Sequence, residues 1–106
     1  MSDGHLSGKH AVVTGGGRGI GAAIARALAQ HGATLTLMGR DRLRLESRSR
    51  ELAAQPVTVD VADADSVAAA FEQATAASGA VHILVNNAGA ASAPPSLARW
   101  RTTAQL

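Results

Sequence analysis

Apolar residues along this chain change their spacing several times, from short continuous runs to helical periods and back. Residues 10–14 form the first apolar run, which stops at a glycine cluster and is typical of a buried strand. From Ile20 the spacing becomes helical, and Gly32 stands where a helix C-cap glycine belongs. The residues at helical spacing are Ile20, Ile24, Ala27, Leu28 and His31.

A second strand, a second helix and a third strand follow. Residues 35–38 form the second predicted strand. Asp41 is placed to cap a helix over residues 42–54, whose apolar stripe is thin and which Pro56 should end. Residues 57–61 form the third predicted strand, because this run is rich in β-branched residues.

The last regular elements are a third helix and a fourth strand. Asp63 is placed to cap the helix, Gly79 to end it, and residues 81–85 form the strand. Strands that alternate with helices of about a dozen residues indicate βαβ units and a parallel sheet. Right-handed crossovers favour the strand order 3-2-1-4, because a chain that steps outward twice must return past its first strand. The predicted fold class is therefore α/β.

The pattern ends after Gly89. Residues 90–96 are small, turn-prone and contain two prolines, so they read as loop. Residues 97–106 favour at most a short helix with Trp100 on one face, and no strand follows. We therefore expect one unit over residues 1–89 and an irregular tail over residues 90–106, with the sheet truncated after its fourth strand. Such an open edge predicts marginal stability or self-association.

Composition excludes several classes of function. The chain has 106 residues, 46% of them hydrophobic and 17% charged, which is globular rather than disordered composition. The absence of cysteine excludes disulfides, thiolate nucleophiles and Cys-ligated zinc, and the four histidines show no metal-ligand spacing. No apolar run reaches the ~18 residues of a membrane helix and no signal pattern opens the chain. We expect a cytoplasmic protein with no membrane partner and no metal.

The positive charge is concentrated in one segment. The net charge is only +2, yet five of the ten Lys and Arg residues lie between Arg40 and Arg50. The arginines within this segment alternate with acidic residues, which favours a solvated helix face with ion pairs. No aromatic platform for bases accompanies them, so nucleic-acid binding is not expected.

A glycine cluster bridges the first predicted strand and helix. Residues 14–21 read Thr-Gly-Gly-Gly-Arg-Gly-Ile-Gly. Glycines let a backbone turn sharply and approach a diphosphate, and the helix N-terminus behind them offers free N–H groups. The spacing Gly15-x-x-x-Gly19-x-Gly21 departs from G-x-G-x-x-G, and no Gly-Lys-Ser/Thr follows, so hydrolysis of ATP or GTP is not expected.

Two further segments lie where a nucleotide would touch them. Asn86-Asn87-Ala88-Gly89 follows the fourth strand, and Asp60-Val61 closes the third. Ligands of open α/β sheets bind outside the carboxyl ends of the strands, at the point where the strand order reverses. Asn87 is placed to approach a ribose, Asp60 to accept from an adenine amine, and Val61 to cover the ring. The alternative is that the asparagines only tie the loop and that Asp60 only begins the next turn.

These motifs resemble those of the short-chain dehydrogenase/reductase family, namely Thr-Gly-x-x-x-Gly-Ile-Gly, Asn-Asn-Ala-Gly and Asp-Val. The resemblance covers residues 6–89 and implies the cofactor-binding half of a three-layer Rossmann fold. It implies NAD(P)(H) as hydride carrier, a small alcohol or carbonyl substrate, and a homo-oligomer at full length. The cofactor-binding positions implied by the motifs are Gly15, Gly17, Arg18, Gly19, Ile20, Gly21, Asp60, Val61, Asn87, Ala88 and Gly89.

Charge at the end of the second strand bears on the choice of cofactor. An NAD-selective site usually places an acid there, and this chain has Gly39. Arg40 follows at once and Arg18 lies in the glycine cluster, so both can reach a 2′-phosphate. The sequence therefore predicts NADP(H) as the preferred cofactor, with NAD(H) as the alternative.

The residues that carry the family's reaction are missing from this chain. The resemblance implies a Tyr acid/base, a Lys four residues later and a Ser that orients the substrate. The chain has no Tyr and a single Lys, Lys9, and neither Ser92 nor Ser96 is assigned as a substitute. No catalytic residue is named, and the chain alone is expected to be inactive.

Two hypotheses stay open from the sequence. The first is an oxidoreductase whose catalytic half is absent from this chain, and the second is a non-catalytic NADP(H)-binding module. A methyltransferase is less favoured, because such enzymes usually place an acid after the second strand, where Gly39 stands.

Overall fold

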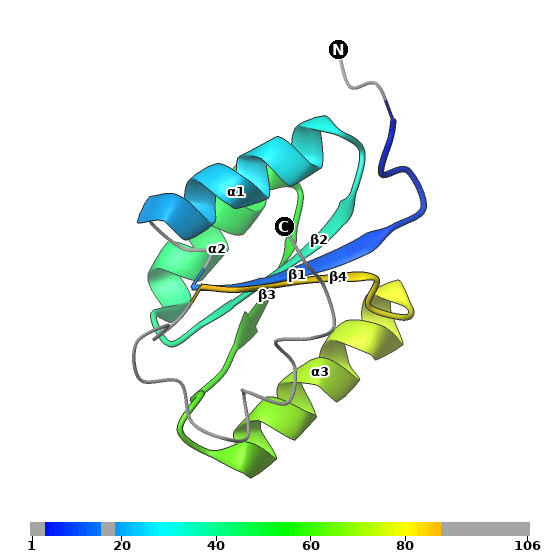
Figure 1. Ribbon diagram of the computed structural model, residues 1–106. Helices are drawn as coiled ribbons and strands as arrows, with labels where there is room; N and C mark the ends of the chain where they lie inside the picture. Colours follow the sequence, from blue (N-terminus) through cyan, green and yellow to red (C-terminus); the bar gives the residue numbers. More distant parts are fainter. Residues whose placement is uncertain (1–3, 16–18, 88–106) are drawn as a thin grey trace.

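A computed structural model describes residues 4–15 and 19–87 of the chain. Four parallel strands form one sheet in the order β3-β2-β1-β4, with α1 and α2 on one face and α3 on the other (Figure 1). This arrangement confirms the predicted three-layer Rossmann fold and its strand order. The elements are β1 (His10–Thr14), α1 (Gly19–Gln30), β2 (Thr34–Gly39), α2 (Arg42–Leu52), β3 (Gln55–Thr58), α3 (Ala64–Ser78) and β4 (Ile83–Asn86).

The core has two halves, one on each face of the sheet. Successive side chains of a strand point to opposite faces, so β1 contributes to both halves. Ala11 and Val13 pack with the residues of α1 and α2, whereas Val12 packs with α3, where Phe71 is the largest buried residue. Every residue of β1 is buried, as expected for a strand covered by helices on both faces.

The third strand differs from its prediction. It covers Gln55–Thr58 rather than residues 57–61, and Pro56 lies inside the strand instead of ending the preceding helix. The backbone N of Val59 donates to the Gly39 carbonyl (2.9 Å), so Val59 directs its backbone groups toward β2. Successive residues of a strand direct these groups to opposite sides, so those of Pro56 and Thr58 point away from β2. A proline without an N–H is tolerated there, at the outer edge of the sheet.

The boundaries of two neighbouring elements also differ. Helix α2 ends at Leu52, two residues before the predicted end, because Ala53 takes the left-handed conformation (φ 54°) and its N–H donates to the Ser49 carbonyl. Strand β4 begins at Ile83 rather than residue 81, although the backbone N–H of His82 already donates to the His10 carbonyl.

Both predicted aspartate caps are present. Asp41 accepts a hydrogen bond from the backbone N of Arg44 (3.2 Å) at the start of α2. Asp63 accepts from the backbone N of Asp65 (2.9 Å) and of Ser66 (3.4 Å) at the start of α3. These caps satisfy N–H groups that have no partner within their helices.

Replacing Asp63 by Ala should lower the free energy of unfolding by about 1 kcal/mol, because α3 loses its cap. Asp63→Asn is the matched control, since asparagine caps about as well as aspartate. Urea denaturation of the two variants measures the difference. Equal midpoints for the Ala and Asn variants would show that the cap contributes nothing.

Two histidines connect the strands at their amino-terminal ends. The ring of His10 is buried, with Nε2 2.7 Å from the Thr36 hydroxyl and Nδ1 3.0 Å from the Gly79 carbonyl. The backbone N of His10 donates to Nδ1 of His82 (3.1 Å). These contacts join β1, β2 and the end of α3 on the amino-terminal side of the sheet, away from the carboxyl ends of the strands.

Candidate functional site

The candidate site lies where β1 and β4 end side by side (Figure 1). Thr14 is paired with Asn86 in the register of the two strands, so the segments that follow them start from neighbouring positions. Gly15 follows β1 directly, donates its N–H to the Met38 carbonyl (2.7 Å) and has a positive φ of 70°. The chain therefore turns away from the sheet at a residue where glycine is strongly favoured.

Thr14 connects the two strands through its hydroxyl. The side chain is 1% exposed, and Oγ1 accepts a hydrogen bond from the backbone N of Asn87 (2.9 Å). The same hydroxyl lies 3.3 Å from both the Val85 carbonyl and Oδ1 of Asn86, to which it can donate. Thr14 thus fixes where the backbone of Asn87 lies. Sequence reasoning missed this role, although a hydroxyl at the end of a strand beside an Asn-Asn pair is a usable signal.

Replacing Thr14 by Val should cost about 1–3 kcal/mol of unfolding free energy, because the backbone N–H of Asn87 loses its acceptor. Thr14→Ser keeps the hydroxyl and is the matched control. Thermal and urea denaturation of both variants test this, and a Val variant as stable as the Ser variant would contradict the role assigned to the hydroxyl.

Gly21 allows α1 to approach the turn after β1 closely. A Cβ added at Gly21 would lie 2.7 Å from Nδ2 of Asn87 and would overlap the carbonyl oxygen of Gly15. The Asn87 side chain donates from Nδ2 to that same carbonyl (3.4 Å). Three residues distant in the sequence therefore meet at one point, and only glycine fits the helix position. The Asn87 side chain thus ties the end of β4 to the turn after β1.

The first turn of α1 faces this junction. Gly19 begins the helix with a positive φ of 62°, and Ile20 is 72% exposed. A helix N-terminus whose first N–H groups lack intrahelical partners is suited to hold an anion such as a phosphate. At this junction α1 packs closely against the turn after β1, and the N-terminus of the helix favours a negatively charged ligand.

Arg40, Asp60 and Val61 also lie at the carboxyl ends of the strands. Arg40 follows β2 and is exposed, while Asp60 and Val61 come just after β3. Oδ1 of Asp60 accepts from the backbone N of Ala62 (3.0 Å), so part of this carboxylate stabilises the turn before α3. Val61 is half-buried and packs against the core on the α3 side of the sheet.

Several predicted positions lie outside the described residues. They are Gly17 and Arg18 of the glycine cluster, Ala88 and Gly89 after β4, and the whole tail over residues 90–106. The structure therefore brings together Gly15, Gly21 and Asn87, and places Gly19 and Ile20 beside them. It puts Arg40, Asp60 and Val61 at the carboxyl ends of β2 and β3, at the same edge of the sheet.

The basic segment forms ion pairs, as predicted from its alternating charges. Nε of Arg44 lies 3.1 Å from the Asp41 carboxylate, and Nε of Arg42 lies 3.0 Å from that of Glu46. Glu51 pairs with Arg48 (3.1 Å) and, across to α1, with Arg26 (3.2 Å). Each acid of α2 and its cap thus has an arginine partner.

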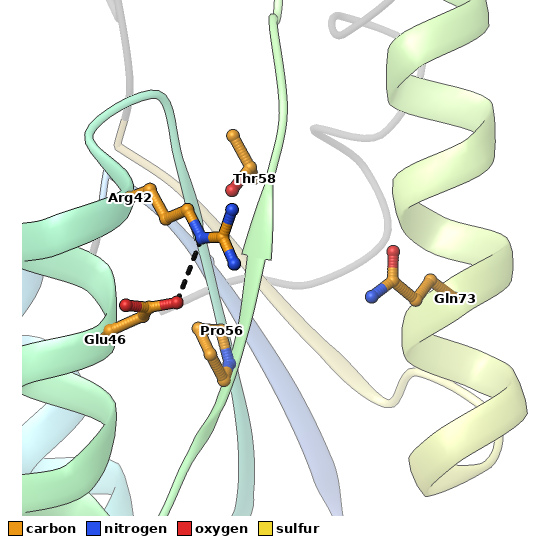
Figure 2. A pocket seen from close by; sticks show the side chains of 5 residues that line it. All are labelled: Arg42, Glu46, Pro56, Thr58 and Gln73. Carbon is orange, nitrogen blue, oxygen red and sulfur yellow. Dashed lines mark hydrogen bonds and ion pairs between the residues drawn. The ribbon is translucent and has the colours of Figure 1, made fainter.

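A groove lies along the outer edge of β3. Its volume is about 270 Å³, and Figure 2 shows it between α2 and α3. None of its lining side chains belongs to the predicted cofactor positions. They are Arg42, Glu46, Pro56, Thr58 and Gln73.

The described residues form neither a metal site nor a membrane-spanning helix. Within residues 4–15 and 19–87, no cluster of three or more His, Asp or Glu side chains is placed to hold a metal ion. None of the helices in these ranges is both long and apolar enough to cross a membrane.

Comparison with known proteins identifies the family to which the chain belongs. The family model described as short chain dehydrogenase matches residues 9–105. D-erythrulose reductase of Gallus gallus is 44% identical over 91 residues, which cover 85% of this chain and 35% of that protein. The chain thus spans about a third of the length of this relative.

Solved structures agree. L-sorbose reductase from Gluconobacter frateurii, complexed with NADPH and L-sorbose, superposes with a TM-score of 0.77 and is 42% identical, covering 82% of this chain and 35% of that one. A metagenomic short-chain oxidoreductase in complex with NADP gives a TM-score of 0.75 and 45% identity, covering 79% of this chain and 40% of that one. Together with the glycine turn packed against Asn87, these matches show that the chain belongs to the short-chain dehydrogenase family.

Proposed function

We propose that this chain is the dinucleotide-binding part of an NAD(P)(H)-dependent oxidoreductase, which oxidises an alcohol or reduces a carbonyl compound. The observation that carries the proposal is the junction of Gly15, Gly21 and Asn87, where an added Cβ at Gly21 would lie 2.7 Å from Nδ2 of Asn87. Such close packing keeps the N-terminus of α1 beside the end of β1, where a diphosphate can approach the backbone.

The proposed contacts follow the order of the strands. Residues 15–21 would hold the diphosphate, Asn87 would lie beside the nicotinamide ribose, and Asp60 with Val61 would contact the adenine. Ile20, which is 72% exposed, would cover the cofactor from the helix side. When bound, the nicotinamide supplies a hydride or accepts one. The part played by these residues is to bind and orient it.

NADP(H) is the proposed cofactor, with NAD(H) as the weaker ligand. Gly39 leaves no carboxylate at the end of β2 to hold the ribose hydroxyls, and the exposed Arg40 follows it. A guanidinium forms charge-assisted hydrogen bonds with a phosphate. NADPH and NADP in the two solved relatives support the binding of a dinucleotide, and the charge of Arg40 is the basis for preferring NADP(H).

Catalysis requires groups that this chain does not provide. The chain contains no Tyr, and its one Lys, Lys9, precedes β1. We assign no catalytic residue and expect the chain alone to bind cofactor without turning over substrate. A binding module without activity is the second candidate. A Tyr-x-x-x-Lys sequence encoded downstream would favour the oxidoreductase.

Titration with NADPH, followed by nicotinamide fluorescence, tests the proposal. Saturable binding with a dissociation constant of about 1 µM to 1 mM is expected, the range in which enzymes usually hold their substrates. ATP is the control ligand, because it has phosphates but no nicotinamide, and it should compete only weakly. An unchanged fluorescence up to millimolar NADPH would reject both candidate functions.

A further inference from the structure

An acidic residue stands directly beside the proposed phosphate-binding arginine. Arg40 follows β2, and Asp41 caps α2 immediately after it. The Asp41 side chain is 57% exposed, so its carboxylate lies at the same surface as Arg40. A free carboxylate at this place would repel a 2′-phosphate and would suit the ribose hydroxyls of NAD(H) instead. The sequence therefore contains a conflict with a preference for NADP(H).

The structure resolves this conflict through a single residue. Oδ1 of Asp41 accepts the backbone N–H of Arg44 (3.2 Å), and Oδ2 lies 3.1 Å from Nε of the same arginine. Both carboxylate oxygens are thus engaged by Arg44, one through the helix cap and the other through the ion pair. The charge of Asp41 is compensated from within the first turn of α2.

The acidic residues within this helix are also paired with arginines. Arg42 turns toward the outer edge of β3 and pairs with Glu46, as Figure 2 shows. Glu51 pairs with two arginines at the far end of the helix. Among the described residues Arg40 has no acidic partner, so its guanidinium remains the uncompensated positive charge at the carboxyl edge of the sheet.

We propose that Arg44 is a positioning residue for cofactor choice, which acts through Asp41: by holding this carboxylate it keeps the surroundings of Arg40 favourable to the 2′-phosphate of NADP(H). The inference rests on the proposed function, because it concerns the same cofactor. In this proposal Arg44 does not contact the cofactor. Loss of the Arg44 side chain would release a negative charge next to Arg40.

The test compares the affinities for NADP⁺ and NAD⁺ by calorimetric titration of the purified protein and its variants at low ionic strength. Arg44→Gln should lower the NADP⁺/NAD⁺ affinity ratio by about three- to tenfold, the size expected for an exposed charge interaction. A loss of helix stability alone would weaken both ligands and leave the ratio unchanged. High salt should reduce the effect, because exposed charges are screened.

A second variant separates action through Asp41 from direct contact with the phosphate. In an Asp41→Asn background, which keeps the helix cap, Arg44→Gln should change the ratio by less than about twofold. If the loss were as large in this background, Arg44 would contact the phosphate itself and the proposal would be overturned. Arg50→Gln is the matched control, because it removes the same charge from an exposed arginine in the last turn of α2.

The two possible failures are distinguishable. If the unaltered protein binds both dinucleotides and Arg44→Gln leaves the ratio unchanged, the role of Arg44 is refuted while the proposed function stands. If the unaltered protein binds neither dinucleotide, the proposed function fails and the role of Arg44 fails with it.

Discussion

Replacing Arg40 by Asp should change the NADP⁺/NAD⁺ affinity ratio by about 100-fold in favour of NAD⁺. The variant removes a charge-assisted hydrogen bond to the 2′-phosphate, which contributes roughly 1.5–3 kcal/mol, and each 1.4 kcal/mol is about a factor of ten. It also introduces a carboxylate that can accept from the ribose hydroxyls of NAD⁺. Exposure of the site reduces both contributions, so 100-fold is the upper part of the expected range.

The control for this prediction carries the same change of charge at a distant position. Arg50→Asp lies in the last turn of α2, and it should leave the ratio within about twofold of the unaltered protein. Calorimetric titrations with both dinucleotides measure the ratio for each variant. An Arg40→Asp ratio equal to that of Arg50→Asp would remove Arg40 from the cofactor site.

Replacing Gly21 by Ala is expected to affect stability and binding together. The added methyl group would meet Nδ2 of Asn87 at 2.7 Å and overlap the Gly15 carbonyl, so α1 or the turn must shift. Overpacking of this kind typically costs about 1–3 kcal/mol of unfolding free energy. Because the shifted backbone is the proposed diphosphate site, the affinity for NADPH should fall by more than about tenfold, the factor that 1.4 kcal/mol represents.

Gly39→Ala is the stability control for this variant. An added Cβ at Gly39 would meet Leu45 Cδ2 at 3.4 Å, which is ordinary contact, so the unfolding free energy should change little. Urea denaturation compares the two variants, and NADPH titration follows the Gly21 variant. A Gly21→Ala protein as stable as Gly39→Ala, with unchanged affinity, would show that the close packing is not required.

The order of the elements could be predicted from the sequence, whereas the limits of the third strand could not. The parallel sheet follows from strands that alternate with helices of sufficient length to cross over. The sequence predicts that Pro56 ends the preceding helix, because proline lacks a backbone N–H and cannot continue a helix. A strand tolerates the missing N–H only where that position does not face a neighbouring strand. The register pairs Pro56 with Leu37 of β2, and the backbone of Pro56 faces the outer edge of the sheet, which the sequence alone does not show.

The residue types of the site were predictable, but their contacts were not. A glycine cluster between a predicted strand and a predicted helix indicates a phosphate-binding turn. The meeting of Gly15, Gly21 and Asn87 depends on the tertiary approach of segments separated by 72 positions, and the Thr14 hydroxyl bond to Asn87 spans 73. The pair of Asp41 and Arg44 is local, and its i,i+3 spacing on a helix makes it accessible to sequence reasoning.

The position of the cofactor is tested most directly by backbone amide NMR spectra recorded during titration with NADPH. We expect the amides of residues 14–21 and of Asn87 to shift first and furthest. Those near His10 and His82, at the other end of the sheet, should stay unchanged. Shifts that leave residues 14–21 unaffected while the cofactor binds elsewhere would contradict the account.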